Sequence, residues 1–438
     1  MRTLRWLVPV LLLGAVAAAV LAPPASPPRQ AAQEFAVAPG AAVAACPGPQ
    51  RLPVGDQGSS GDLAASTDDR LLLVFGEGES TPVGIGTAWT APIAGSLERV
   101  GDGDIAGLAA VTCLTAGFDE WLVGGATTLG SSARLILSNP SDAPAEARVT
   151  VYGPLGQVGE PVVIAVGPRS QEERLIEGIA VELPTLALHV ESSGPGLVAV
   201  LQDSRLDGFQ PAGTDLVGAL APSTRLVIPA VGSPVEGSTV TLRLMAPEGA
   251  SATVAFVSET GPQPWLGARG IELEPGVVTD IPVPVEGVGA IEVTADAPVL
   301  AAARTVVPRL ATEGTIGDLA YDHSWTLGVD DSTAATLAAV VPLETATLAV
   351  YSPVGGSVTF TDPQGATIAT ASVPARTVAR VPVTLPPGTL VTATGRFAWA
   401  VELTTEEGWI ATLVPASTER ADRELLVAPG QYAPVVGR

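Results

Sequence analysis

The sequence predicts an all-β protein, with tandem immunoglobulin-like β-sandwich domains after an N-terminal transmembrane helix. Three observations predict this fold class. A six-residue motif occurs three times at a nearly constant step, short runs rich in β-branched residues alternate with turns, and one long uncharged segment stands near the N-terminus. Together they indicate a row of like domains outside the cytoplasm.

The repeated motif has an aliphatic residue on each side of a variable one, and proline three positions further on. It begins at Leu135 (LILSNP), Leu242 (LRLMAP) and Leu348 (LAVYSP), so the copies are 107 and 106 residues apart. A motif repeated at a constant step indicates one structural unit copied in tandem. The same series of apolar runs follows each copy, at residues 149–156, 253–261 and 358–365, then 164–168, 271–275 and 371–374, then 186–190, 290–294 and 390–394.

Each repeated unit has the features of a β-sandwich. Its runs are short and rich in Val, Ile, Leu and Thr, which suit a pleated strand. Turn signals recur about every 8–12 residues, and a unit of about 100 residues is the usual size of an immunoglobulin-like domain. No long segment after the N-terminus has helical periodicity, so we expect little helix.

Residues 6–22 carry no charge, and as a helix of about 25 Å they reach the short end of the range that crosses a bilayer. Arg2 and Arg5 precede them, which places the rest of the chain outside the cytoplasm. A cleaved signal peptide, giving a secreted protein, is the alternative, because residues 17–19 are small. Pro23 argues against cleavage just before it, so we favour an uncleaved single-pass anchor in the cell membrane.

Cys46 and Cys113 are the two cysteines of the chain. Outside the cytoplasm they can form a disulfide, which by the chain-entropy model would stabilise the fold by roughly 4 kcal/mol. Two unrelated buried thiols are the alternative. The disulfide would tie the start of the folded region to the apolar run that ends at Cys113, and it would make residues 46–117 a small domain of their own.

The predicted organisation combines these elements. A Pro/Ala-rich linker separates the anchor from the folded region, and the chain ends with a run similar to the one that opens the second sandwich. We expect this run, residues 424–429, to return and complete a sheet, such as that of the N-terminal region. The predicted segments are 1–22 (transmembrane anchor or signal peptide), 23–45 (linker), 46–117 (small N-terminal β domain), 118–220, 221–317 and 318–420 (β-sandwiches) and 421–438 (C-terminal strand and tail).

The chain is strongly acidic. Its net charge is −23, its pI is about 4.3 and all 22 of its basic residues are arginine. A surface of this kind offers no basic stripe for phosphates, so we expect no nucleic-acid binding. It would also repel an anionic membrane surface, which leaves the N-terminal helix as the expected membrane contact.

The sequence contains no recognisable catalytic motif. It lacks the signatures of serine hydrolases, zinc proteases and P-loops, and neither cysteine has zinc-ligand spacing. Strand alternation places His189 on an outer face beside Glu191, where we expect it to face solvent. His323 lies in an Asp-His-Ser string, but neighbours in sequence cannot form a triad, so we expect a linker loop there. We therefore predict no enzymatic activity and no cofactor.

Two acidic pairs, Asp102 with Asp104 and Asp330 with Asp331, are candidates for calcium, since hard cations prefer carboxylate oxygens. Neither pair has the EF-hand spacing. Solvated turns are the simpler interpretation, and we assign no metal site.

Trp121 and Trp325 both stand where a repeat begins, while the second repeat has no tryptophan there. We expect them to pack against the core or the seam between domains, and a ligand-facing role is the sharper alternative. Any specific function should be sought where the copies differ. Trp121, Trp325, Asp330 and Asp331 are therefore the candidate interaction residues.

Three motifs and the anchor add a resemblance to a known family. The motifs are CPGP ending at Pro49, WLVGG ending at Gly125, and Leu-x-Leu-x-Asn-Pro ending at Pro140. With them, nearly the whole chain resembles a family of uncharacterised actinobacterial membrane-anchored secreted proteins. The resemblance implies an extracytoplasmic location, and its motifs are structural, so it implies no catalytic residues.

The leading functional prediction is a non-enzymatic, membrane-anchored scaffold or partner-binding protein of the cell envelope. A module that binds cell-wall glycan is the first alternative, and it would present a row of exposed Trp or Tyr side chains. A carboxylate-based hydrolase is the second, and it needs two acids about 5–10 Å apart in a concave site. The expected partners are the membrane, through the helix, and an envelope protein or glycan.

Overall fold

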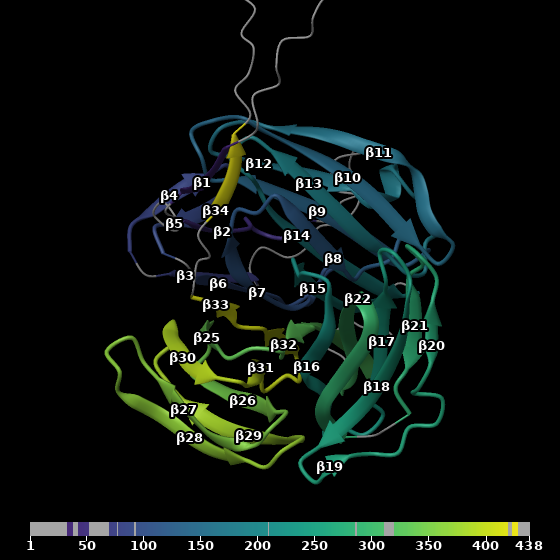
Figure 1. Cartoon of the computed structure of the whole chain (residues 1–438), viewed down its shortest axis with the longest axis vertical. Helices are drawn as coiled ribbons and strands as arrows, with labels where there is room; N and C mark the ends of the chain where they lie inside the picture. The colour runs from purple at the N-terminus through teal and green to yellow at the C-terminus, as the bar shows by residue number, and fades with distance from the viewer. Residues whose placement is uncertain are drawn as a thin grey trace, which may run out of the picture. The chain divides into compact units, whose positions relative to one another are not determined.

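A computed structural model describes most of the chain from residue 33 to residue 427. The described ranges form antiparallel sheets joined by turns, with no α-helix among them (Figure 1). The all-β prediction is therefore confirmed. Two compact units are present, Ala41–Glu419 and the two terminal segments Met1–Gly40 and Arg420–Arg438. The described residues are 33–37, 43–51, 70–76, 78–91, 93–208, 210–284, 287–310, 319–418 and 423–427.

The terminal unit contains a two-stranded antiparallel sheet. Strand β1 (Gln33–Val37) pairs with β34 (Arg423–Val427), and Phe35 lies opposite Leu425. The C-terminal strand is paired, as expected, but it forms a separate two-stranded sheet with β1 and does not complete the sheet of the predicted domain 46–117. Its partner, however, lies in the segment predicted as a linker, residues 23–45. That part of the linker prediction is wrong, because alternating apolar residues in β1 suit a strand.

The predicted transmembrane helix, residues 1–22, lies outside the described residues. So does the end of the predicted C-terminal tail, residues 428–438. Within the ranges that the structure describes, no helix has the length and apolar character needed to cross a membrane.

The larger unit begins with a six-stranded sheet. Cys46 and Cys113 lie in neighbouring strands of this sheet, with Cα atoms 4.8 Å apart, and form the predicted disulfide. Both cysteines are fully buried. The strand order is β3 (Arg70–Gly76), β6 (Ala94–Val100), β7 (Gly107–Thr115), β2 (Ala44–Cys46), β5 (Gly86–Trp89) and β4 (Ser80–Val83).

Three pairs of sheets follow along the chain. The sheets of the first pair have the orders β12 (Ser170–Leu175), β9 (Ser131–Asn139), β14 (Val198–Asp207), β15 (Gln210–Gly218) and β11 (Gly156–Val166), β10 (Ala145–Gly153), β13 (Ala187–Ser193), β8 (Asp119–Val123). The strands of the second pair are joined through β22 (Gly287–Leu310) into one nine-stranded sheet. Its two parts have the orders β21 (Thr279–Pro282), β17 (Thr239–Met245), β22, β23 (Leu319–Leu327) and β19 (Gly261–Pro262), β18 (Ala250–Ser258), β22, β16 (Ser223–Ser233), β24 (Val329–Asp330), with β20 (Ile271–Leu273) beside β18. The sheets of the third pair have the orders β29 (Thr377–Thr384), β26 (Thr345–Ser352), β31 (Ala398–Thr404), β32 (Ile410–Leu413) and β28 (Thr367–Val373), β27 (Gly356–Thr361), β30 (Thr389–Gly395), β25 (Ala335–Val341), β33 (Ala416–Ser417).

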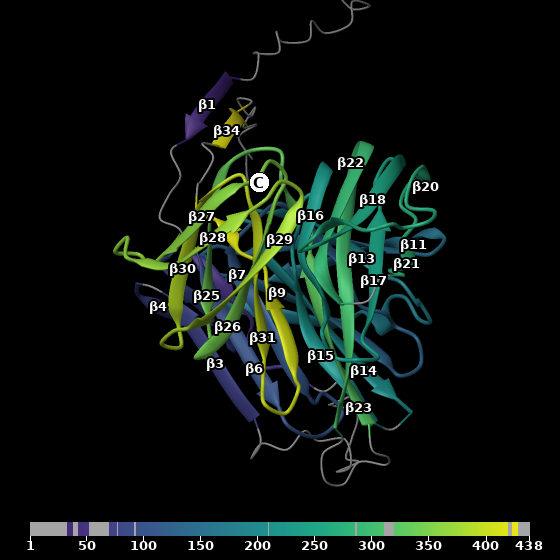
Figure 2. The ribbon, with the colours of Figure 1, turned by 90° about the horizontal axis from the view of Figure 1, so that it is seen from below.

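The three pairs share one connectivity. The strand with the repeated motif is the second strand of its sheet in every pair (β9, β17 and β26), and the last long strand lies at the edge of that sheet (β15, β23 and β32). In the second pair the 24-residue strand β22 belongs to both sheets, and Figure 2 shows it running beside β16 and β18. The repeat found in the sequence therefore corresponds to a repeat of strand order.

The repeated and the variable positions of the motif face different neighbours. The two aliphatic residues of each copy pack in the core of their own sheet pair. The middle residue faces the other way: Ile136 packs with the N-terminal sheet, Ala349 packs with Ala230 of the second pair, and Arg243 reaches the first pair. The copied residues thus build each core, and the variable residue makes contacts between pairs.

One predicted boundary is wrong. Strand β23 falls within the predicted third sandwich, 318–420, but it pairs along its whole length with β22 of the second pair. His323 and Trp325 therefore lie on the last strand of the second pair, and the linker loop expected at His323 does not exist. Side chains on both faces of β23 are buried, among them Asp322 and Ser324 on one face and His323 and Trp325 on the other, so this edge strand is covered on both sides.

Among the described residues, the N-terminal sheet shares its buried clusters with the first and third pairs, contrary to the prediction of a separate domain over 46–117. Leu97 and Leu108 belong to the core of the third pair. Val111 belongs to a cluster shared with Ile136 of the first pair. A single sheet can bury both of its faces only against neighbouring sheets. The N-terminal sheet therefore packs between the first and the third pair.

Replacing both cysteines tests the contribution of the disulfide. The double variant Cys46→Ala/Cys113→Ala should unfold with a free energy lower by roughly 4 kcal/mol, because the bond closes a loop with a sequence separation of 67 residues. Denaturant unfolding of wild type and variant measures the difference. Equal stabilities would show that the tie between β2 and β7 contributes nothing.

Candidate functional site

The last strands of the three sheet pairs meet each other and β7 at a junction, where β7, β15 and β32 lie close together (Figure 1). Asp215 on β15 accepts hydrogen bonds from the backbone N–H of Ala110 on β7 (3.4 Å) and of Trp325 on β23 (2.6 Å). Asp322 on β23 accepts one from the N–H of Ile410 on β32 (2.8 Å). Two aspartates thus connect four sheets.

Both of these carboxyl groups are fully buried. Burial raises the pKa of Asp215 and of Asp322 well above the usual range, although the backbone N–H groups that they bind act in the opposite direction. Among the described atoms, Oδ1 of Asp322 has no hydrogen-bond partner. Neither group is within reach of a substrate in solvent.

A third buried acid, Asp203 on β14, joins the first and second pairs. Its carboxylate accepts two hydrogen bonds from Arg205 (2.8 and 3.1 Å) and one from the indole N–H of Trp325 (2.8 Å). Nε2 of His323 lies 3.4 Å from Oδ2 of the same group. Burial alone would raise the pKa of Asp203, but Arg205 and His323 outweigh it and hold this pKa below its usual range. The first pair therefore supplies both the carboxylate and its charged partner Arg205, and the second pair adds the indole N–H of Trp325.

Arg243 on β17 also connects the first and second pairs, beside Trp325. Its guanidinium binds Asp280 in a bidentate pair (2.7 and 2.9 Å) and donates to the carbonyl oxygens of Gly125 (2.6 Å) and Leu186 (3.2 Å) in the first pair. It lies over the Trp325 ring, 5.0 Å from the centroid. Gly125 has φ +78°, which favours glycine. The WLVGG motif that ends at Gly125 thus has a structural reason.

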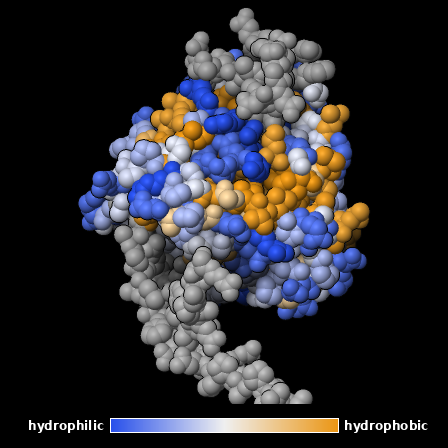
Figure 3. Space-filling view, turned by 90° about the horizontal axis from the view of Figure 1, so that it is seen from above, coloured by the Kyte–Doolittle hydropathy of each residue, from blue (hydrophilic) through white to orange (hydrophobic). Residues whose placement is uncertain are grey.

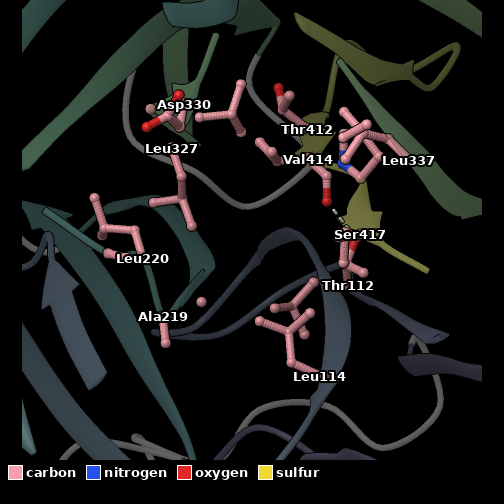
Figure 4. Close-up of a pocket in the computed structure, with 18 of the residues that line it drawn as sticks. Thr112, Leu114, Ala219, Leu220, Leu327, Asp330, Leu337, Thr412, Val414 and Ser417 are labelled. Atoms are coloured by element: carbon pink, nitrogen blue, oxygen red, sulfur yellow. Dashed lines mark hydrogen bonds between the residues drawn. The ribbon is translucent and has the colours of Figure 1, made fainter. Parts of the chain in front are cut away.

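A pocket of about 390 Å³ lies beside the junction. Figure 4 shows Leu114, Leu220, Leu327 and Val414, from four separate segments, around one space. Asp330 is the only titratable residue among the described residues that line it. No single sheet pair forms this pocket, because all three pairs and β7 contribute residues to its described lining.

The predicted interaction residues lie in three different places. Trp325 is 2% exposed at the junction, and Asp330 is exposed at the edge of the pocket, where its Oδ2 accepts a hydrogen bond from Ser223 (2.7 Å). Asp331 is buried and forms a bidentate pair with Arg225 (3.1 and 3.3 Å). The structure therefore brings Trp325 and Asp330 to one pocket and places Asp331 in an ion pair.

Trp121 lies elsewhere, on β8. It is 7% exposed and stacks on His189 with ring centroids 4.0 Å apart. His189 is half-buried by this contact, and its Nε2 lies 2.8 Å from Oδ1 of Asp119. The expectation that His189 faces solvent is therefore wrong in part, because Trp121 covers its ring.

The remaining candidate pair, Asp102 and Asp104, lies in the turn between β6 and β7. Burial raises the pKa of Asp104. Over the described ranges, no three His, Cys, Asp or Glu side chains are grouped so that they could hold a metal ion. The acids that do gather, at the junction, are bonded to protein atoms.

Arg243→Ala should lower the free energy of unfolding by about 3–5 kcal/mol. The substitution leaves the carboxylate of Asp280 without its ion pair and the carbonyl oxygens of Gly125 and Leu186 without their donor. The matched control is Arg148→Ala. Arg148 lies 3.5 Å from Glu191 in an exposed pair, and such pairs contribute about 0–1 kcal/mol. Chemical denaturation of the three proteins gives the comparison. Similar losses for the two variants would contradict the role assigned to Arg243.

Glu120 gives a pH test. It is 8% exposed, its Oε2 accepts the N–H of Ala199 (2.9 Å), and burial raises its pKa from 4.5 to about 8. The folded state then binds more protons than the unfolded state between these values, so its contribution to stability decreases as pH rises from about 4.5 to about 8. Glu120→Gln removes this decrease. The free energy of unfolding of the variant, relative to that of wild type, should increase by on the order of a few kcal/mol between pH 4.5 and pH 8. Denaturant unfolding of both proteins at the two pH values measures this increase. A constant difference between the two proteins would contradict the raised pKa.

The comparisons with known proteins concern the whole arrangement and no single site. No curated protein and no solved structure matches the chain. The model of a family of unknown function matches residues 78–389, which is more than half of the chain and includes the junction residues of the first two pairs. The chain therefore belongs to the family of unknown function DUF5719.

Proposed function

We propose that this protein is a non-enzymatic binding protein of the cell envelope, anchored by residues 1–22 and extending outside the cytoplasm. The observation that carries the proposal is that the acidic side chains at the junction are buried and bonded to other groups of the protein. Asp203, Asp215 and Asp322 are fully buried and bind protein groups, and the neighbouring pocket has a single acid at its edge. Such a site suits binding better than acid–base catalysis, which needs a positioned group within reach of a substrate.

The architecture supports a scaffold. We take the three sheet pairs to be immunoglobulin-like sandwiches, because each has two antiparallel sheets around one core. They share clusters with each other and with the N-terminal sheet. A body built in this way presents loops and edges in fixed positions, as a partner-binding protein requires.

The surface supports a protein partner. Figure 3 shows one larger hydrophobic area among hydrophilic residues on the face that it draws. Leu129, Leu155 and Leu266, each at least 95% exposed, lie on loops between strands. Exposed apolar areas with a polar border are typical of interaction sites.

Two alternatives have less support. A glycan-binding face needs exposed aromatic side chains, but each of the six described tryptophans is buried or half-buried. A hydrolase of the carboxylate type needs two acids about 5–10 Å apart in a concave site. The described lining of the junction pocket offers one, Asp330.

Affinity capture tests the proposal. The full-length protein with a C-terminal tag, crosslinked in the membranes of its source organism, should retain one defined envelope protein in a fixed ratio. The same protein, unfolded and with its disulfide reduced, serves as the control and should retain none. Turnover of an envelope polymer that stops when one acidic residue is replaced by its amide would contradict the proposal.

A further inference from the structure

The junction pocket is a product of the assembled repeats. The three sheet pairs contribute corresponding segments to it, residues 218–223, 327–330 and 414–417, and β7 supplies the fourth wall. Its volume of about 390 Å³ lies within the range of about 300–1,000 Å³ that is usual for small-molecule sites. The residues that make the three segments different are therefore those that shape the pocket.

The walls of the pocket are mainly aliphatic. The described lining contains two aromatic side chains, Trp325 and Phe397, and Trp325 already uses its indole N–H on Asp203. Flat rings and sugars are usually held by aromatic faces, whereas branched aliphatic walls suit a flexible hydrocarbon chain. The main aliphatic side chains are those of Leu114, Leu216, Leu220, Leu327, Leu337 and Val414.

Two hydroxyl groups inside the pocket are bonded within the protein. Thr112 Oγ1 donates to the carbonyl oxygen of Val414 (2.6 Å), and Thr412 Oγ1 accepts from Ser324 (3.0 Å). A polar group on the buried part of a ligand would lose its bonds to water with little in return, which costs about 1–3 kcal/mol for each group. The buried part of the ligand is therefore mainly apolar.

The edge of the pocket has the opposite character. Asp330 is exposed there, and each of its carboxylate oxygens accepts one hydrogen bond, from Ser223 Oγ (2.7 Å) and from the N–H of Ser332 (2.6 Å). Burial raises the pKa of Asp330, but these hydrogen bonds outweigh it, so the net change is downward. A carboxylate oxygen can accept two hydrogen bonds, so this carboxylate can accept a further one from a ligand. The same carboxylate, on a chain of net charge −23, repels an anion.

We propose that the pocket binds an aliphatic chain that ends in a hydroxyl or ammonium group, with the chain between the walls and the donor group at Asp330. This inference deepens the proposed binding function and rests on it. The ligand can be a free amphiphile or the lipid portion of an envelope component, since both present the same chemistry.

Photolabelling of the full-length protein in lipid nanodiscs tests the proposal. The probe is an eight-carbon alkylamine with a diazirine at its methyl end, and mass spectrometry locates the labelled peptides. Label should appear in peptides that contain residues 218–223, 327–330 or 414–417. Octylamine and 1-octanol should compete with the probe, and octanoate should compete at least tenfold more weakly.

Variants separate the pocket from general partition into lipid. Ala219→Phe fills the pocket and should lower the labelling of these peptides at least tenfold, while Ala366→Phe, at an exposed loop position, should not change it. Thr333→Trp covers the pocket from its exposed edge and provides a second test if Ala219→Phe does not fold. Asp330→Asn removes the negative charge at the edge of the pocket. It should therefore reduce the difference between octylamine and octanoate in how strongly they compete with the probe.

Three results would overturn the inference. They are labelling that is unchanged in both Ala219→Phe and Thr333→Trp, label confined to other peptides, or octanoate that competes with the probe as well as octylamine does. If the envelope partner is captured and these results occur, the proposed function stands and the alkyl ligand is wrong. If the alkyl compounds bind as expected and no protein partner is captured, the pocket is a ligand site and the partner part of the proposed function is wrong.

Discussion

The buried carboxylate of Asp203 is the constraint on which the arrangement of the sheets depends. A charge without access to water must be paired and hydrogen-bonded. Its partners come from its own strand, through Arg205, and from the second sheet pair, through Trp325 and His323. The last strand of the second pair must therefore lie against the first pair in one register, and Arg243 lies over the ring of Trp325. The position of β23 then sets the pocket, because Trp325 and Leu327 form one of its walls.

The repeat explains how three copies of one strand motif make different contacts with neighbouring sheets. The aliphatic residues of the motif, such as Leu135 and Leu348, fill equivalent places in separate cores, and they can be copied because each core needs the same packing. Positions that face away from the core are free to differ. They hold isoleucine at 136, arginine at 243 and alanine at 349, and each faces a different neighbour. Copied residues thus give stability, and variable ones decide which sheets meet.

Most of the fold could be predicted from the sequence, but the junction could not. The β-branched runs and the pair Cys46–Cys113 led to correct expectations of strands and of a disulfide. The repeat step predicted the copied strand order, but it placed the boundary before β23 wrongly. His323 was expected in a loop because polar neighbours such as Asp322 resemble a linker, whereas both faces of β23 are buried. Asp203 was missed, although it follows directly on the mainly apolar run that begins at residue 198. A charged residue next to such a run is the one sequence signal of a buried ion pair. The pocket had no signal, since its walls come from segments about a hundred residues apart.

Thermal unfolding of the full-length protein by differential scanning calorimetry tests the central claim most directly. If the N-terminal sheet and the three pairs depend on shared cores and on one buried carboxylate, residues 41–419 unfold in one transition, and its calorimetric and van't Hoff enthalpies agree. Asp203→Asn should move that whole transition to lower temperature. Separate transitions for individual sheet pairs, with only one of them affected by Asp203→Asn, would contradict the account.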